Sequence, residues 1–255
     1  MSGLNAQARE RQAGLSLTEL LLCLAIGSSL LLGISQLHAE TRLHYLRQQN
    51  QLEHLEDSRH LFLLLEQEIA KAGYRRQPDQ AVENIFSAQQ FSAAGKHCAL
   101  ASGQTIAHID DSSFCLRYQP ALPGSHGCDG KAIDNVPPSP YSTYPGQPVI
   151  SLFSFDAQTH ELRCNGDAIA QGIERLRFEY GASNGGDTAG LHFNSTPTPG
   201  QTIRAIRYRA CLVSTQKAGS PPSLDATCAD KTDAQPGRHR PRDFGVTLAL
   251  RNIQP

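Results

Sequence analysis

The run from Leu15 to Leu37 is apolar at almost every position and contains a single charged residue, Glu19. A helix over this run would be about 34 Å long at 1.5 Å per residue, enough to cross the hydrocarbon core of a bilayer. A carboxylate inside such a helix costs about 2.5–3.5 kcal/mol on insertion scales, so a charge kept there is a functional hypothesis by default. The sequence therefore predicts a helix in lipid or against other helices, with Glu19 in need of a partner.

The residues around the start of this run resemble the type IV prepilin signal, also called the class III signal. A leader with Arg9 and Arg11 precedes Gly14, and the segment Gly14–Glu19 reads Gly-Leu-Ser-Leu-Thr-Glu. In that family a membrane peptidase cuts after the glycine and methylates the new N-terminus, and a glutamate lies at the fifth mature position. The resemblance implies cleavage between Gly14 and Leu15. The first mature residue is most often Phe in the family, and Leu15 departs from it.

Cleavage at this point would leave a positively charged amine four residues before Glu19. Opposite charges attract far more strongly in a medium of low dielectric constant than in water. The amine of one subunit could therefore neutralise Glu19 of its neighbour in a filament. The alternatives are an ordinary secretory signal or a plain anchor. A secretory signal has a small-x-small site after its apolar core, and the nearest candidate, Leu37-His38-Ala39, has a large outer residue.

Apolar residues continue beyond the membrane run at steps of three and four, which favours one helix over residues 15–72. No proline interrupts it, and Gly73 is a suitable stop. We expect residues 38–73 to lay an apolar stripe on a globular head. The predicted stripe consists of Leu43, Leu46, Leu52, Leu55, Phe62, Leu65, Ile69 and Ala72.

From Pro78 onward, short β-rich runs alternate with clusters of turn residues. Three runs alternate apolar and polar residues, which is typical of an antiparallel sheet with one wet face. Their inward residues are Leu176, Phe178 and Tyr180; Ile206, Tyr208, Ala210 and Leu212; and Phe244, Val246, Leu248 and Leu250. The six predicted strands are Thr105–Ile109, Ser113–Tyr118, Pro148–Phe155, Glu174–Tyr180, Ile203–Val213 and Phe244–Arg251.

Three long segments between the strands read as loops, and we expect cysteines to tie some of them down. They are Leu122–Gln147, Gly181–Thr202 and Ala218–Arg240.

Seven cysteines divide into one and six. Cys23 lies in the membrane run and is expected to be a small packing residue. Six others in a segment outside the cytoplasm predict disulfides, with fifteen possible pairings. Short loops favour Cys115–Cys128 and Cys211–Cys228, which leaves Cys98–Cys164. Zinc is the alternative, and the absence of a Cys-x-x-Cys pair disfavours it.

Little in the sequence points to catalysis, metal or cofactor binding, and we expect none. His44 and His54 lack the i, i+4 spacing of two metal ligands on one helix face. Cys98 beside His97 could be a nucleophile, but a disulfide is the simpler role for this cysteine. Asp110-Asp111 is not followed by ligands at the spacing of a calcium-binding loop.

The charges nearly cancel, with 23 Lys and Arg against 24 Asp and Glu, which argues against nucleic acid as a direct ligand. Two clusters of basic residues are candidates for contact with phosphate groups. A solvent-exposed surface on which acidic residues balance the charge explains them better. They are the run Arg238–Arg242 and the outward set Arg204, Arg207 and Arg209.

Four later segments resemble one group of this family, the PilW-type minor pilins, also called the prepilin-peptidase-dependent protein B group. Pseudopilin J of type II secretion is similar in layout. The segments follow the order of that group: Glu66–Arg75, Leu162–Gly166, Gly172–Gly181 and Leu250–Asn252.

The resemblance implies an α+β, type IV pilin-like fold. Residues 1–14 would be a leader, 15–37 a transmembrane or filament-core helix, 38–73 an amphipathic helix, and 74–255 a periplasmic β-rich head with disulfide-tied loops. The chain would cross the bacterial inner membrane once, with its head in the periplasm. After assembly it would lie in the pilus filament or at its tip.

The implied function is that of a minor pilin, without enzymatic activity, in a complex that primes filament assembly. Its implied partners are other minor pilins, the major pilin and the prepilin peptidase, with a tip adhesin as a further candidate. Two alternatives stay open: a pseudopilin J-like subunit, and a membrane-anchored periplasmic enzyme or binding module.

Overall fold

The computed structural model describes residues 16–183, 191–198, 201–212 and 243–252. The chain divides into two compact units, Met1–Asn50 and Gln51–Pro255, with the boundary inside the first helix. The fold class is α+β, as the sequence predicts: a long N-terminal helix is followed by antiparallel sheets and disulfides.

The helix α1 runs without a break from Leu17 to Ala70, close to the predicted span. It stops where the sequence predicts a stop. Gly73 has a φ of +72°, a left-handed conformation that glycine adopts without a steric penalty. Its amide donates a hydrogen bond of 2.9 Å to the carbonyl oxygen of Arg117 on a strand of the head, which fixes the direction in which the chain leaves the helix.

Among the described side chains of α1, the buried stripe begins at Leu61. Leu61, Leu65 and Ile69 are at most 1% exposed and lie in the main core, at steps of four residues. Leu61 was missing from the predicted stripe. The prediction was wrong for Leu52, which is 62% exposed and lies nine residues before Leu61. The side chains of Leu43, Leu46 and Leu55 lie outside the described part of the structure.

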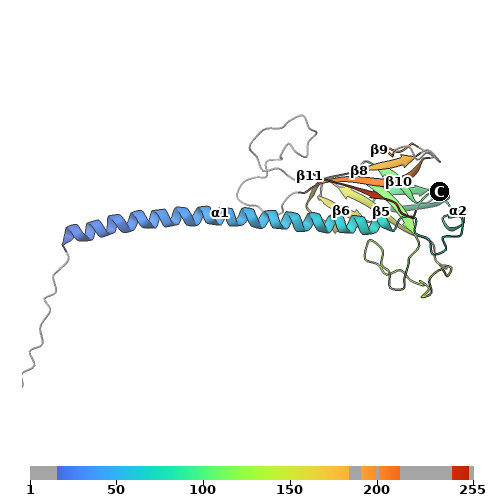
Figure 1. The fold of residues 1–255 in the computed structure, drawn as a ribbon, viewed down its shortest axis with the longest axis horizontal. Coiled ribbons are helices and arrows are strands. Elements are labelled where there is room, and N and C mark those ends of the chain that lie inside the picture. The colour runs from blue at the N-terminus through green and yellow to red at the C-terminus, as the bar shows by residue number, and fades with distance from the viewer. Residues whose placement is uncertain (1–15, 184–190, 199–200, 213–242, 253–255) are drawn as a thin grey trace, which may run out of the picture. The chain divides into compact units, whose positions relative to one another are not determined.

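The head contains two antiparallel sheets and a hairpin, and the last turns of α1 pass beside its strands (Figure 1). The five-stranded sheet has the order β3-β4-β5-β6-β7, and the four-stranded sheet has the order β11-β10-β8-β9. The strands of the first are β3 (Ile106–Asp110), β4 (Ser113–Tyr118), β5 (Val149–Asp156), β6 (Glu161–Cys164) and β7 (Asp167–Ala170). Those of the second are β8 (Ile173–Ser183), β9 (His192–Asn194), β10 (Thr202–Leu212) and β11 (Asp243–Ala249).

All six predicted strands are confirmed within a few residues, whereas five short strands were missed. The missed strands are β6, β7, β9 and the two strands of the hairpin. The hairpin consists of β1 (Gln89–Ala93) and β2 (Lys96–Leu100), and it follows the short helix α2 (Val82–Ile85).

Two apolar clusters lie on opposite faces of the five-stranded sheet. Phe114 and Leu116 of β4 join the main core together with α1 and the four-stranded sheet. Cys115, between them in sequence, belongs to a second cluster with Cys98 and Leu100 of β2. Successive residues of a strand point to opposite faces, so one strand supplies both clusters.

The alternation predicted in the four-stranded sheet is confirmed. Leu176, Phe178 and Tyr180 of β8 are buried, while Arg177 between them is exposed. Ile206, Tyr208, Ala210 and Leu212 of β10 are buried as well. On β11, Val246 and Leu248 are half-buried and pack against the main core.

Arg76 organises the long segment between β4 and β5. Its side chain is 2% exposed and has no acidic partner among the residues that the structure describes. Instead its guanidinium donates to backbone carbonyl oxygens along the segment, including those of Ala121 at 2.6 Å and Pro137 at 3.1 Å. The remaining acceptors are the carbonyls of Pro120, Ser139 and Ser142 and the hydroxyl of Ser142.

Arg117 does the same for the segment between α1 and β3. It is fully buried, and it donates to the carbonyl oxygens of Gln104 and Ala101, both at 2.6 Å. It also donates to the carbonyls of Phe86 and Ser87. Burial lowers the pKa of this guanidinium to about 10, which is still well above neutral pH. Each arginine thus holds an irregular segment in one conformation.

Outcomes for the three predicted loops differ. Leu122–Gln147 contains no strand, apart from an isolated bridge between His126 and Ala132. Gly181–Thr202 was wrong in part, because β8 continues to Ser183 and β9 lies inside the segment, where both pair in the four-stranded sheet. The loop Ala218–Arg240 lies outside the described residues.

Candidate functional site

The first candidate site is the beginning of α1. Ser16 directly precedes the helix, and its carbonyl oxygen accepts hydrogen bonds from the amides of Glu19 (3.0 Å) and Leu20 (3.1 Å). Glu19 therefore lies in the first turn. A carboxylate is favourable there, because the unpaired amides of a helix N-terminus carry partial positive charge.

The segment that follows is suited to an apolar environment. By length and composition, the stretch Leu17–Arg42 could cross a membrane, with a mean hydropathy of 2.1 and none of its most apolar window buried. Its large apolar side chains are exposed; Leu31, for example, is 69% exposed. From Leu17 to Leu37 the one charged residue is Glu19. The site thus combines a single acid with a surface that avoids water.

The serine hydroxyl groups in this segment find partners within the helix. Ser28, Ser29 and Ser35 each donate to the carbonyl oxygen three residues earlier, at 2.8–3.0 Å. An unsatisfied hydroxyl in hydrocarbon would cost several kcal/mol. These bonds leave the helix surface compatible with lipid or with the apolar interior of an assembly.

The processing residues predicted beside Glu19 are not placed. Gly14 and Leu15 lie outside the described residues, so cleavage between them stays a prediction. The exposed cysteine of the segment, Cys23, is a free thiol.

The disulfides correct the predicted pairing. Cys98 is bonded to Cys115, and Cys128 to Cys164. The predicted Cys115–Cys128 and Cys98–Cys164 pairs are both wrong, because the members of each lie on opposite faces of the five-stranded sheet. Cys98 and Cys115 belong to the second cluster, whereas Cys164 belongs to the main core, against which Cys128 packs. Cys211 is also disulfide-bonded, while Cys228 lies outside the described residues.

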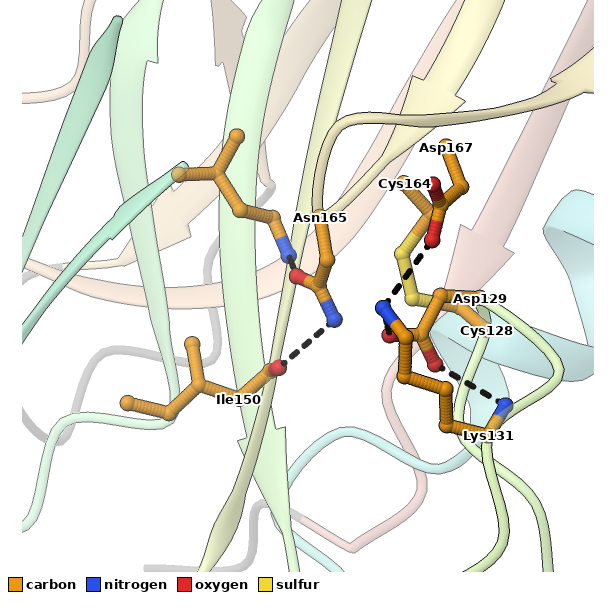
Figure 2. A network of polar contacts seen from close by, with 8 residues as sticks. Cys128, Asp129, Lys131, Ile150, Cys164, Asn165 and Asp167 are labelled. Carbon is orange, nitrogen blue, oxygen red and sulfur yellow. Dashed lines mark hydrogen bonds and ion pairs between the residues drawn. A yellow bond between two sulfur atoms is a disulfide. The ribbon is translucent and has the colours of Figure 1, made fainter. Parts of the chain in front are cut away.

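Cys128 ties the predicted loop Leu122–Gln147 to the sheet, and an ion network next to the disulfide does the same (Figure 2). The ammonium of Lys131 lies 3.0 Å from a carboxylate oxygen of Asp129 and 3.0 Å from one of Asp167 on β7. Beside it, the Asn165 side chain accepts a hydrogen bond from the amide of Leu152 at 2.9 Å. The loop is therefore tied to the sheet at residues 128 and 131.

The residues of the head that were weighed as catalytic or metal-binding candidates make structural contacts. Cys98 is in a disulfide, and the His97 ring lies 2.7 Å from the Ser92 hydroxyl. Asp110 pairs with Lys96 at 2.6 Å. Burial alone would raise the pKa of Asp110, but hydrogen bonds from Lys96 and Ser112 outweigh it, so the pKa is lowered. Among the described residues, no group of three or more His, Cys, Asp or Glu side chains could hold a metal ion.

An open cleft with a volume of about 390 Å³ lies where α1 ends. The ammonium of Lys71 lies 5.5 Å from the ring centroid of Tyr118 in its wall, and 2.6 Å from a carboxylate oxygen of Glu68. Burial raises the pKa of Tyr118 to about 12, and the nearby charge of Glu68 adds to this. The other ionisable groups of the lining are Tyr74 and His126.

The outward arginines of the four-stranded sheet separate into different environments. Arg207 ion-pairs with Glu179 at 3.4 Å and lies over the ring of Phe193, 3.9 Å from its centroid. Arg204 is half-buried, whereas Arg209 is exposed and lies directly opposite Arg177 of β8. The pattern of the sequence found Arg207 and Arg209 but not the pairing of Arg209 with a second arginine. The run Arg238–Arg242 lies outside the described residues.

No protein-family profile, curated protein or solved structure gives a significant match to this chain. The helix and the disulfides nevertheless define a broad class of protein. An exposed apolar helix near the N-terminus, followed by a disulfide-bonded β-rich domain, is the composition of a membrane-anchored or secreted chain with its head outside the cytoplasm.

Proposed function

We propose that this chain is a minor pilin of a type IV pilus, and that it joins a complex of minor pilins that primes filament assembly. The role is structural, without catalysis, cofactor or metal. The prepilin peptidase would cut between Gly14 and Leu15 and methylate Leu15. The mature chain would sit in the bacterial inner membrane with its head in the periplasm, and then enter the filament or its tip.

One observation carries the proposal. Glu19 lies in the first turn of a helix whose surface is otherwise uncharged and apolar as far as Leu37, five residues after a glycine that follows a basic leader. A carboxylate in that position needs a cation when the helix enters lipid or packs against others. The new amine of an adjacent subunit would supply the cation.

The architecture of the head supports the same reading. The last turns of α1 bury Leu61, Leu65 and Ile69 against antiparallel sheets. A chain that has an apolar helical segment and a folded head allows a subunit to be packed by its helix and to present its head to neighbours. The major pilin, other minor pilins and a tip adhesin are the proposed partners.

Mass spectrometry of the protein extracted from membranes tests the processing step. The expected mature chain begins with an N-methylated Leu15. A chain that keeps the leader, or one cut after Ala39, would contradict the proposal.

Substitution of Glu19 tests the assembly step. Glu19→Ala should abolish incorporation into filaments while the chain is still cleaved and inserted. Gln36→Ala, in the same helix, is the matched control and should leave incorporation unchanged. If the Glu19→Ala chain were incorporated as well as the control, the pairing role of the acid would be wrong.

Co-purification separates the pilus from a type II secretion system, where a pseudopilin J-like subunit would act. The full-length chain, solubilised after cross-linking, should carry other minor pilins and the major pilin. Recovery of secretion pseudopilins alone would favour the alternative.

A further inference from the structure

Two arginines face each other at the centre of the outward surface of the four-stranded sheet. Arg177 of β8 is the direct cross-strand partner of Arg209 of β10, and both side chains are exposed. The Cβ atoms of directly opposite residues lie about 4.5–5.5 Å apart, and like charges in such positions destabilise a sheet. The free protein therefore keeps an unfavourable pair at the middle of this face.

Nothing in the described part of the chain neutralises the pair. Neither Arg177 nor Arg209 takes part in a hydrogen bond or an ion pair with another described residue. The acid in the next row, Glu179, is engaged by Arg207, which is its own cross-strand partner. Arg207 is further held by Phe193 and by the hydroxyl oxygen of Thr247, which accepts a hydrogen bond of 3.2 Å from Arg207 Nε.

The neighbouring strand leaves the pair open. Gly245 of β11 lies directly opposite Arg209 and has no side chain that could cover it. A Cβ built on Gly245 would lie 3.7 Å from Cγ of Arg209, an ordinary contact. There is thus room for a side chain at this position, and no side chain of the described residues fills it.

The chemistry of the pair selects its ligand. A guanidinium presents parallel N–H groups that match a carboxylate in a bidentate arrangement. Nucleic acid would require a long track of positive charge, whereas the chain has a net charge of −1 and Glu179 lies on the same face. Arginine and aromatic side chains together, as in Arg207 with Phe193, are typical of the centres of protein interfaces.

We propose that the face around Arg177 and Arg209 is a docking surface for an acidic segment of a partner protein, whose carboxylates bind the two guanidinium groups. Binding removes the repulsion between the two arginines, so the relief of that repulsion adds to the free energy of binding. This inference stands on the geometry of the sheet alone and does not require the assembly role of Glu19.

Photo-cross-linking of the full-length chain in the cells that make it tests the surface. Gly245→p-benzoylphenylalanine places the cross-linker beside Arg209, where the structure has room for it. The expected product is a protein whose cross-linked peptide contains at least two Asp or Glu residues. Replacing those acids of the partner by Arg should abolish the cross-linked product. The product should return when the acid-to-Arg partner is combined with the chain that carries Arg177→Glu and Arg209→Glu.

The charge-reversed chain R177E/R209E should give at least about tenfold less product, as expected when a close interfacial charge pair is removed. R59E/R251E changes the net charge by the same amount at two exposed residues outside strands β8, β10 and β11, and should change the yield less than twofold. Equal yields from the two variants would overturn the proposal. So would cross-links to nucleic acid or lipid, cross-links to a peptide without acids, or no product at all.

Discussion

The Asn252 side chain is bonded to the end of α1: its Nδ2 donates hydrogen bonds to the carbonyl oxygen of Ala70, at 2.9 Å, and to that of Ala72, at 3.3 Å. The last carbonyls of a helix have no partner within the helix. Asn252 satisfies two acceptors in this region, and it joins the segment after β11 to the element on which the sheets pack.

Asn252→Asp removes the donor at constant shape. We expect the free energy of unfolding of the head to fall by about 1–2 kcal/mol, the cost of a lost hydrogen bond with its acceptors left behind. Urea unfolding monitored by tyrosine fluorescence measures it. Asn84→Asp, at an exposed residue of α2, is the control and should change the value by less than about 0.5 kcal/mol.

Arg76→Met should release the segment between β4 and β5. Several buried carbonyl oxygens would lose their donor at once, and each unsatisfied acceptor costs about 1–3 kcal/mol, so we expect a loss of more than 3 kcal/mol in total. Limited proteolysis should then cut within residues 120–147. Arg75→Met is the matched control: Arg75 makes a single exposed bond, to the carbonyl of Gln80, and its loss should leave the segment protected.

The disulfide pairing can be read directly. Peptide mapping of the unreduced protein should recover Cys98 linked to Cys115 and Cys128 linked to Cys164. Replacing Cys128 and Cys164 together by Ser should cost about 4 kcal/mol, and replacing Cys98 and Cys115 about 3 kcal/mol, because the first bond closes the longer loop. Recovery of a peptide linking Cys115 to Cys128 would contradict the structure.

The head should lose stability at alkaline pH. Burial raises the pKa of Tyr208, with a further contribution from Glu66, and burial also raises the pKa of Tyr180. Since the folded state keeps these phenols protonated, their contribution is complete below the ordinary pKa of about 10 and falls as the pH rises above it, by up to about 1.4 kcal/mol per pH unit for each tyrosine.

Tyr208→Phe isolates one of these groups. The Tyr208 hydroxyl has no hydrogen-bond partner in the described part of the structure, so the variant should be as stable as the original chain at pH 8. Above pH 10 its free energy of unfolding should decline more slowly, by the share of one tyrosine. Parallel curves for the two proteins would show that Tyr208 is not held neutral.

Arg177→Glu should stabilise the isolated protein although it weakens the proposed docking. An opposite-charge pair with Arg209 replaces a like-charge pair, which is worth about 0.2–1 kcal/mol. Arg207→Glu is the comparison with the opposite sign, because it places a second acid opposite Glu179 and loses the contact with Phe193. A destabilised Arg177→Glu protein would mean that the two guanidinium groups do not repel each other.

The sequence was a good guide wherever a strand or helix has a regular apolar pattern. β8 and β10 alternate apolar and polar residues, and the inward residues predicted for them from the sequence are buried. β7, with the sequence Asp-Ala-Ile-Ala, and β2, with Lys-His-Cys-Ala-Leu, have no such pattern. Their conformation comes from pairing with neighbouring strands, which a single sequence does not reveal.

The roles of the buried arginines and the pairing of the disulfides could not be predicted from the sequence pattern alone. Arg76 and Arg117 have backbone carbonyls as partners, and carbonyls are present at every residue, so no spacing in the sequence marks the sites. The alternation of β4 does assign Cys115 and Phe114 to different faces of the sheet. The face on which Cys128 lies depends on the path of the loop, which is set by Arg76.

The cysteine pattern has a consequence for how the head is made. In the described structure the first extracytoplasmic cysteine bonds to the second, and the third to the fourth, whereas the predicted arrangement placed one bond inside the other. A head that is exported in order of sequence presents each cysteine just before its mate. An oxidant that joins thiols as they arrive then produces the correct bonds at the first attempt, and the maturing chain has no need of an isomerase to undo mistakes.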